Sequence, residues 1–349
     1  MTPTRAARLR RSGTLVGVIL TTALLGACTA DGAPMPVPTP EYTSTYAAPA
    51  PLVIAPLTGR PIEAGAAANP SIAAKIDNHP QARPQVGLDT TDIVFEEMVE
   101  GGLTRYVAVW QSTIPAELGP VRSIRPMDPD IISPFGGIVA YSGGQYRFVE
   151  LMKAAPVYNA IHGQRDTADT FYRSRDKRAP HNVLVKASTV VAQHADLKPP
   201  AQQFGYAIDA LSATAATEGT PTAKINLRFG APSTPSWTWD AASGTWLRFQ
   251  AGVKDTATTG KQLTATNIVV VRVKVDNGLG VPKSELVGSG EAWVSSGGAT
   301  VHARWSKGSA TSRIRLVDDN GAAVRLAPGN TWVELVPSSG SVAFVAPKG

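Results

Sequence analysis

Acidic, basic and imidazole side chains gather at the ends of apolar runs between residues 75 and 182, where strands lead into loops. Binding and catalytic groups are often placed on such loops. Arginine side chains bind carboxylates and phosphates with two parallel hydrogen bonds. We therefore predict one polar cleft for an anionic or sugar-bearing ligand. Its candidate residues are Asp77, Asn78, Arg83, Glu97, Arg105, Arg122, Arg125, Arg173, His181 and Asn182.

Carboxylates in the same stretch offer acid–base chemistry as an alternative. Asp77 with Glu97, or alternatively with Glu100, is the pair expected for a hydrolase or transferase acting on a cell-wall polymer, where two carboxyl groups flank a glycosidic bond. Glu96 and Glu97 point to opposite faces of a strand, so at most one of them shares a site with Asp77. Ion pairs with arginine explain the same residue types structurally. Whether the protein is an enzyme stays open at this point.

Other kinds of site lack their motifs. Asp77, His79 and His181 could ligate a metal, but their spacing matches no zinc motif, so we expect structural histidines and no metal. Ser142 lacks the preceding glycine of a hydrolase nucleophile turn. Phosphate-binding glycine motifs do not occur, so we expect no cofactor.

The first 27 residues have the plan of a signal peptide, with arginines, an apolar run and a small-residue exit. The run from Leu15 to Leu25 is shorter than the ~20 residues of a membrane span. The next residues, Leu25-Gly26-Ala27-Cys28, resemble the bacterial lipobox. That resemblance implies a diacylglyceryl thioether on Cys28, cleavage before it and fatty acylation of the new amine. We expect a protein anchored by lipid to the extracytoplasmic face of the cell membrane.

Net charge and cysteine content limit the kinds of partner that we expect the protein to bind. The formal net charge is +6, but four arginines lie in the acid-free leader, so about +2 remains after cleavage. This balance leaves no electrostatic footprint for nucleic acid. Cys28 is the only cysteine, which excludes an internal disulfide. The membrane and a wall glycan, peptide or anionic polymer are the expected partners.

Composition divides the chain into parts. Residues 28–56 are a Pro-rich tether without enough apolar groups to fold. Residues 57–197 predict an α+β domain with a mixed sheet and flanking helices, including helices near 146–152 and 188–195. Residues 198–222 are a low-complexity linker. Residues 223–347 alternate short strands with turns and predict a mostly-β domain, either a sandwich or an open barrel.

Tryptophans are concentrated in the β-rich part: Trp237, Trp239, Trp246, Trp293 and Trp305. Core packing and cross-strand pairing explain them most simply. A carbohydrate-stacking platform is an alternative. Exposure of Trp293 or Trp305 would favour a third function, a protein-docking module in this domain.

Longer motifs resemble a known family. They are Lys75–Gln85, Glu100–Arg105, Gly119–Pro126, Ala179–Asn182 and Pro328–Val333. Together they are similar to the YerB-like family of bacterial lipoproteins, over roughly residues 56–347. The resemblance implies a motif-bearing N-terminal domain and a smaller β-rich C-terminal domain. It supplies no catalytic residues, because the activity of the family is not established. Family members often carry His before the glycine pair where this chain has Ser142, so we assign that position no proton transfer.

Overall fold

The computed structural model describes residues 53–348. The predicted signal peptide, Cys28 and the tether up to residue 52 lie outside the described residues. Regular structure is present from the first described residue, because strand β1 (Val53–Ile54) pairs with β2 (Pro61–Ile62). No helix within residues 53–348 is long and apolar enough to cross a bilayer.

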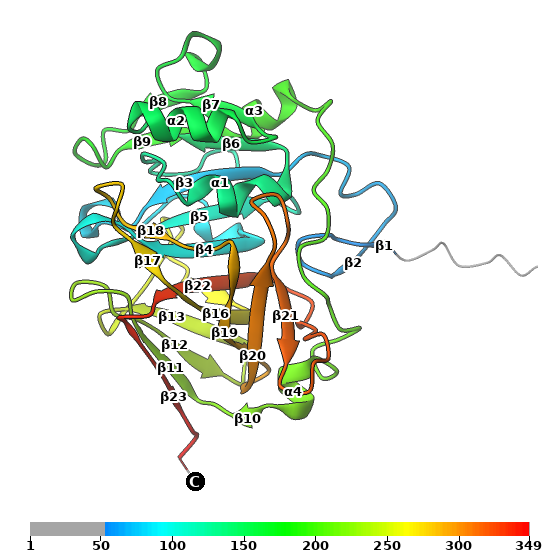
Figure 1. The fold of residues 1–349 in the computed structure, drawn as a ribbon. Helices are drawn as coiled ribbons and strands as arrows, with labels where there is room; N and C mark the ends of the chain where they lie inside the picture. Colours follow the sequence, from blue (N-terminus) through cyan, green and yellow to red (C-terminus); the bar gives the residue numbers. More distant parts are fainter. Residues whose placement is uncertain (1–52, 349) are drawn as a thin grey trace, which may run out of the picture. The chain divides into compact units, whose positions relative to one another are not determined.

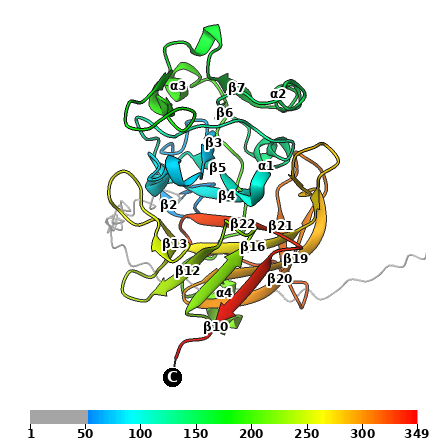
Figure 2. The same cartoon turned by 90° about the vertical axis from the view of Figure 1, so that its left-hand side faces the viewer.

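The largest sheet contains strands from both the predicted α+β region and the predicted mostly-β region. Its order is β10-β20-β19-β16-β22-β4-β5-β3-β6-β7, with β21 beside β20. Figures 1 and 2 both show β3, β5, β4, β22 and β16 following one another. The bounds are β3 (Ile72–Asp77), β4 (Ile93–Met98), β5 (Thr104–Trp110), β6 (Ile138–Tyr141), β7 (Tyr158–Ile161), β10 (Thr220–Pro221), β16 (Asn267–Val273), β19 (Gly288–Ser296), β20 (Ala299–Lys307), β21 (Arg315–Asp318) and β22 (Thr331–Pro337).

β22 joins the two regions. It lies parallel to β16 on one side and to β4 on the other. All seven of its residues are buried, as expected for a strand covered on both faces of a sheet. The sheet is mixed, as the sequence predicts, since β3 pairs with β5 antiparallel and with β6 parallel.

A second sheet covers one face of the first. Its order is β14-β13-β12-β11-β23, with β15 beside β13. Apolar side chains of both sheets form one core, which includes Ile225 and Trp237 from the second sheet and Val270 and Trp332 from the first. The C-terminal region is therefore mostly β and layered, as predicted. The bounds are β11 (Lys224–Arg228), β12 (Pro235–Asp240), β13 (Thr245–Gln250), β14 (Val253–Lys254), β15 (Thr264–Ala265) and β23 (Ser341–Val345).

Helices are few and flank the large sheet. The two that the sequence predicts are present as α2 (Tyr146–Lys153) and α3 (Ala187–Gln193). α1 (Asp128–Ile132) and α2 pack on the face opposite the second sheet, where Ile131, Phe148 and Met152 join a second core. α3 packs on the other face through Val190 and Val191.

The stretch 198–222 is ordered, which its composition does not suggest. It contains α4 (Thr214–Glu218) and β10, and Phe204 and Ala213 are buried. Small alanines allow it to lie close against the strands, and the Tyr206 hydroxyl donates to the Leu57 carbonyl at 2.6 Å.

The short remaining elements connect these layers. They are β8 (Phe171–Arg173), β9 (Val183–Val185), β17 (Val275–Asp276), β18 (Lys283–Ser284) and the 3-10 turns η1 (Pro80–Ala82), η2 (Leu88–Thr90), η3 (Glu100–Gly102), η4 (Ser133–Phe135) and η5 (Arg165–Thr167).

Candidate functional site

Asp77, the last residue of β3, lies at the centre of a polar cluster. Its Oδ2 atom is 2.6 Å from His181 Nδ1 and 3.2 Å from Arg122 Nε. Its Oδ1 atom accepts the backbone N–H of His79 at 3.0 Å. Asp77 is 3% exposed, so this carboxylate holds three groups in place from below the surface.

Backbone hydrogen bonds fix the loops that carry these partners. The loop with Arg122 lies between β3 and β9, since Arg122 N donates to the Lys75 carbonyl at 2.8 Å and Val121 N donates to the Val183 carbonyl at 2.8 Å. His181 lies two residues before β9, and Arg122 Nη1 also donates to the Pro180 carbonyl at 3.4 Å. Chain segments distant in sequence are thus held side by side.

Two imidazole rings stack at the surface of the cluster. His79 and His181 have ring centroids 4.4 Å apart and an interplanar angle of 16°. His79 Nδ1 accepts from Gln81 N at 3.2 Å. Burial lowers the pKa of His79, and the charges of His181, Arg122 and Arg83 lower it further while Asp77 raises it. The ring is therefore neutral near pH 7, with its proton on Nε2.

His181 is oriented by its contact with Asp77. An ionised carboxylate only accepts hydrogen bonds, so Nδ1 of His181 carries the proton that bridges to Asp77. Nε2 of His181 has no hydrogen-bond partner within residues 53–348. This nitrogen is free to bind or to accept a proton.

Arg105, on β5, adds a buried positive charge. It is 8% exposed, and its Nη1 donates to the Ser123 carbonyl at 2.8 Å. Arg125 Nη1 donates to the same carbonyl at 3.3 Å. Burial lowers the pKa of Arg105 to about 10, helped by the charges of Arg125 and Arg122 and opposed by those of Asp77 and Glu100.

The carboxylates near these arginines are already occupied. Arg125 donates to Glu100 from Nε at 2.8 Å and from Nη2 at 2.7 Å, and Arg122 forms an ion pair with Asp77. Arg105 forms no ion pair with a carboxylate among the residues that the structure describes. We name this group, comprising Asp77, His79, Arg105, Arg122, Arg125 and His181, the Asp77 cluster; it has more cations than anions.

Glu97 lies under the cluster rather than in it. It shares a row with Asp77 and Arg105, because the register pairs Arg105 with both residues. Its carboxylate contacts Lys75 Nζ, which also lies 2.7 Å from Asp128 Oδ1, and all three side chains are fully buried. Burial lowers the pKa of Lys75 to about 8, although Asp128 raises it. The predicted acid–base pairing of Asp77 with Glu97 therefore does not fit, because Glu97 reaches no surface and is bound to a lysine.

Asn78 and Arg83 belong to the opposite face of the sheet. Asn78 donates to Thr104 Oγ1 at 2.7 Å and to Glu96 Oε1 at 3.4 Å. It accepts from Arg83 Nε at 2.9 Å, and Arg83 also donates to the Asn78 carbonyl at 2.8 Å. Asn78 is buried, so it positions the turn after Asp77, while Arg83 approaches the cluster closely enough to lower the pKa of His79.

Behind Asn78 lies a buried network centred on Arg248 from β13. This guanidinium contacts Glu96 and lies 3.0 Å from both Asp255 and Glu334. It also stands over the rings of Trp332 and Trp237, at 4.3 and 5.0 Å. The network joins β4, β22 and β13, and therefore connects the two sheets.

Arg173 and Asn182 stabilise the loop that carries His181. Arg173 Nη1 donates to Asn182 Oδ1 at 2.9 Å, and Asn182 Nδ2 donates to the Ser174 carbonyl at 2.9 Å. Their contacts are made within the hairpin between β8 and β9. The sequence predicts that both residues touch a ligand, whereas the side-chain hydrogen bonds that the structure shows are one between them and one to the Ser174 carbonyl.

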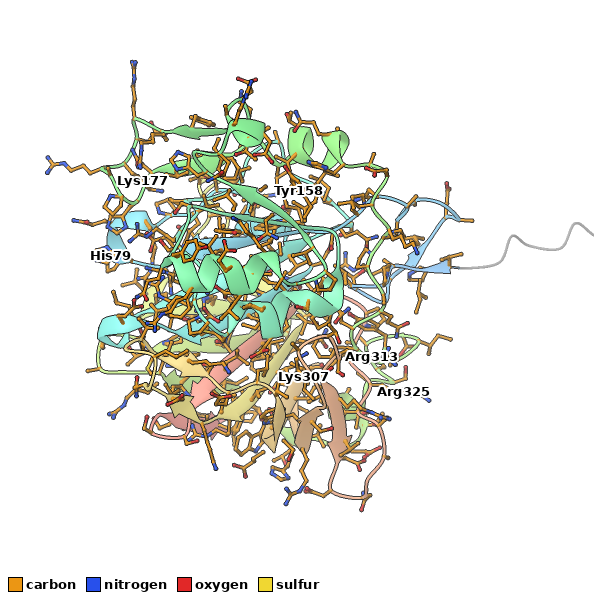
Figure 3. The ribbon with its side chains drawn as sticks, turned by 45° about the horizontal axis from the view of Figure 1, so that its top comes forward. His79, Tyr158, Lys177, Lys307, Arg313 and Arg325 are labelled. Atoms are coloured by element: carbon orange, nitrogen blue, oxygen red, sulfur yellow. The ribbon has the colours of Figure 1, made fainter. Side chains whose placement is uncertain are left out.

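The set of cleft residues predicted from the sequence does not include His79, Lys75, Asp128 or Lys177, and His79 is considered there only as a metal ligand. Lys75 could have been found, because it precedes Asp77 by two residues and so shares its face of the strand. Lys177 donates to the Pro84 carbonyl from across the site, and Figure 3 shows it on the same side of the molecule as His79. Asp128 carries no such signal, because the turn that leads to α1 brings it beneath β3.

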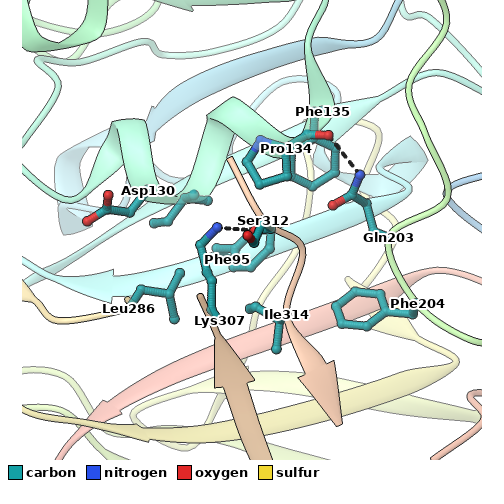
Figure 4. A pocket seen from close by; sticks show the side chains of 11 residues that line it. Phe95, Asp130, Pro134, Phe135, Gln203, Phe204, Leu286, Lys307, Ser312 and Ile314 are labelled. Atoms are coloured by element: carbon teal, nitrogen blue, oxygen red, sulfur yellow. Dashed lines mark hydrogen bonds between the residues drawn. The ribbon is translucent and has the colours of Figure 1, made fainter. Parts of the chain in front are cut away.

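Neither metal ligation nor the apolar crevice beside α1 identifies a second site in the described part of the chain. Within residues 53–348 no group of His, Cys, Asp and Glu side chains is arranged to hold a metal ion. The apolar crevice around Phe95, Phe135 and Lys307 has a volume of about 10 Å³ (Figure 4), room for about one water molecule. Lys307 closes it by donating to the Ser312 and Ala310 carbonyls. It is a packing feature rather than a ligand pocket.

Comparisons with known proteins agree with the fold. Residues 57–200 match the family description "Protein of unknown function (DUF3048) N-terminal domain", and residues 225–333 match the C-terminal domain of the same family. The chain is 26% identical over 296 residues to the "Putative lipoprotein YerB" of Bacillus subtilis (strain 168), covering 81% of this chain and 86% of that protein. It is also similar to the crystal structure of the YerB protein from Bacillus subtilis, with a TM-score of 0.73, 24% identity, and coverage of 83% of this chain and 99% of that one.

Proposed function

The chain belongs to the DUF3048 family, and on that premise we propose that it is a lipid-anchored envelope protein whose Asp77 cluster binds a phosphate-bearing ligand. The observation that carries this proposal is Arg105. A buried cation without a carboxylate partner among residues 53–348 is costly. An anionic phosphate group beside Arg105 and Arg122 would supply the missing negative charge with charge-assisted hydrogen bonds.

The geometry around the cluster supports an anion over a neutral ligand. Arg122 and Arg105 are held from behind by carbonyls and by Asp77, so little side-chain freedom is lost when a ligand binds. His181 Nε2 and the Nε2–H of His79 add one acceptor and one donor at the same surface. A hydrogen phosphate group offers both donor and acceptor oxygens to match them.

The lipid anchor has separate support. The lipobox-like Leu25–Cys28 and the similarity to a protein described as a lipoprotein point the same way. We expect Cys28→Ser to move the protein from the membrane fraction to the soluble fraction, and mass spectrometry to find lipid on the wild-type amino terminus alone. Retention of the variant on membranes would contradict the anchor.

Calorimetry tests the ligand class. We titrate the full chain with inorganic phosphate and with glycerol phosphate oligomers, because both present anionic phosphate oxygens; the oligomer carries one charge per internal phosphodiester and no P–OH there, so the two titrations distinguish a free phosphate from a polymer. Each charge-assisted hydrogen bond contributes about 1.5–3 kcal/mol, so Arg122→Met is expected to weaken binding by about tenfold or more. Arg313→Met is the matched control, because Arg313 also donates to a backbone carbonyl, at 3.0 Å, and lies far from His79 in Figure 3. Equal binding by both variants would overturn the proposed site.

Hydrolysis at the same cluster is the second candidate, favoured by the orientation of His181. Asp77 fixes Nδ1 of His181 at 2.6 Å, which leaves Nε2 placed to take a proton from water attacking a bound ester. His181 would then replace Glu97 as the base. Incubation with cell-wall polymer followed by mass spectrometry distinguishes the candidates: an enzyme releases products that His181→Asn does not, whereas a binding protein releases none.

A further inference from the structure

Trp293 differs from most tryptophans of this chain. Trp110, Trp237, Trp246, Trp305 and Trp332 are buried, whereas Trp293 is partly exposed. Trp239, the other partly exposed one, packs against Trp246 with ring centroids 5.3 Å apart. Trp293 instead lines a surface cavity of about 300 Å³, which is at the small end of ligand pockets.

Three aromatic rings from three strands form this cavity. The centroid of Trp293 on β19 lies 5.6 Å from that of Phe344 on β23 and 5.6 Å from that of His302 on β20. The planes of Trp293 and Phe344 meet at 47°, so the rings form an open V. Figure 1 shows β10, β20 and β23 together at the end of the molecule where the C-terminus leaves.

The rest of the lining carries no charged side chain: it consists of Thr220, Pro221, Thr222, Thr300 and Ala346. The Thr222 hydroxyl donates to the Thr220 carbonyl at 3.0 Å and the Thr300 hydroxyl lies 2.7 Å from Ser295 Oγ, whereas Thr220 is exposed. Carboxylates stand behind His302 instead: Asp319 Oδ1 lies 2.7 Å from Nδ1, and Glu291 Oε1 lies 3.3 Å from Nε2. They hold the imidazole edge-on to Trp293 at 67°.

From this lining we propose that the Trp293 cavity is a binding site for one ring of a neutral saccharide. The C–H face of a pyranose packs against aromatic rings, here those of Trp293, Phe344 and His302, and its hydroxyl groups can exchange hydrogen bonds with the exposed Thr220. An anion would find no cation in the lining, and a cation would find no carboxylate. A purely apolar ligand would leave the exposed Thr220 hydroxyl without water. This site does not depend on the Asp77 cluster.

The test titrates the full chain with three neutral oligosaccharides: the β-1,4-linked tetramer of N-acetylglucosamine, cellotetraose and maltotetraose. Tryptophan fluorescence and saturation-transfer NMR are the measurements. We expect at least one sugar to bind, and Trp293→Ala to weaken that binding by about tenfold or more, a loss of about 1.4 kcal/mol. Trp293→Phe keeps a flat ring and should retain part of the binding.

Controls separate loss of the site from loss of the fold. Tyr146→Ala removes an aromatic ring that is 80% exposed on α2, and it should leave saccharide binding unchanged. His302→Gln provides a second, less disruptive change in the cavity and should also weaken binding. Circular dichroism shows whether each variant is folded.

Two results would overturn the proposal. One is failure of all three sugars to bind the folded wild type. The other is saccharide binding that Trp293→Ala and His302→Gln leave unchanged. Trp293-dependent binding of a peptide in place of every sugar would assign the cavity to protein docking instead.

Discussion

In the proposed site, Arg105 is the residue at which stability and phosphate binding would oppose each other. It is buried beside two other guanidinium groups, and its only hydrogen bond in the described chain goes to a carbonyl. Sites that bind charged ligands often hold charges that the free protein would be more stable without. The same arrangement makes Arg105 a more informative target than Arg125, whose charge Glu100 already matches.

We predict that Arg105→Met leaves the free energy of unfolding unchanged or raises it by about 1 kcal/mol, while phosphate binding weakens at least about tenfold. Methionine keeps the apolar stem and removes the charge. Urea unfolding and calorimetry on the same preparation measure both quantities. A fall in unfolding free energy of several kcal/mol would mean that Arg105 is a structural cation.

Unlike Arg105, Lys75 is expected to stabilise the folded protein. It is fully buried between Glu97 and Asp128, so Lys75→Met would leave both carboxylates without their cation. We expect the free energy of unfolding to fall by about 3–5 kcal/mol, measured by urea denaturation. Lys153→Met breaks a half-exposed pair with Glu150 on α2 and should change it by less than about 0.5 kcal/mol. Similar losses in the two variants would contradict this view.

Residue alternation explains which parts of the site the sequence predicts. Asp77, Arg105 and Glu97 do fall on one face, and Glu96 faces the other way, as strand geometry requires. Alternation does not reveal partners. The sequence suggests a pairing of Glu97 with Asp77, but it gives no sign of Asp128, the first residue of α1, which holds Lys75 together with Glu97.

Among the elements, the loop before α1 matters most for the site. Its residues are hydrogen-bonded to β3 on one side and to β9 on the other. Its glycine and prolines predict a turn from sequence, but these pairings join residues far apart in the chain. The sequence therefore predicts that Arg122 lies in a loop, but only the fold shows that this loop places Arg122 beside Asp77.

β22 carries the most strongly perturbed carboxyl group of the buried network. Burial raises the pKa of Glu334 to about 8 from 4.5, with Glu96 raising it further and Arg248 opposing. Between pH 4.5 and about 8 the folded state holds this proton and the unfolded state does not. Unfolding then releases a proton, so this group makes stability fall as pH rises through that window.

Glu334→Gln should remove this pH dependence, since Gln keeps an acceptor for Trp237 Nε1 and stays neutral. Each pKa unit corresponds to about 1.4 kcal/mol. We expect the variant to equal the wild type at pH 5 within about 1 kcal/mol and to be more stable by about 2–4 kcal/mol at pH 8.5, in urea unfolding at both pH values. A constant difference across pH would contradict the assignment.

At the scale of the whole described body, the shared sheet is the feature that composition hides. The α+β and mostly-β character of the two regions follows from strand and helix patterns, and so do α2, α3 and the layered β region. The pairing of β22 with β4 cannot be predicted from these patterns, because about 240 residues of chain separate the two strands and no local pattern indicates such a contact. The stretch 198–222 is likewise ordered by what it packs against.

This sheet predicts that the family's N-terminal region does not fold alone. A fragment of residues 53–200 would lose β22 and expose the edge of β4, whose residues Ile93–Glu97 pair with it. We expect its proton NMR spectrum to be poorly dispersed, whereas the chain from residue 53 to 349 unfolds in one transition by both circular dichroism and fluorescence. A well-dispersed fragment spectrum would show that the two regions are independent.

The central claim, that the Asp77 cluster receives a phosphate, has a direct test because the chain contains only five histidines. Imidazole nitrogen shifts in ¹H–¹⁵N NMR can be followed for all five during titration with glycerol phosphate oligomers, with glycerol as the uncharged control. We predict that His79 and His181 shift while His162, His194 and His302 do not, and that Arg105→Met needs at least about tenfold more oligomer to produce the same shifts. Unchanged His79 and His181 signals at saturating oligomer, or equal shifts at all five rings, would contradict the account.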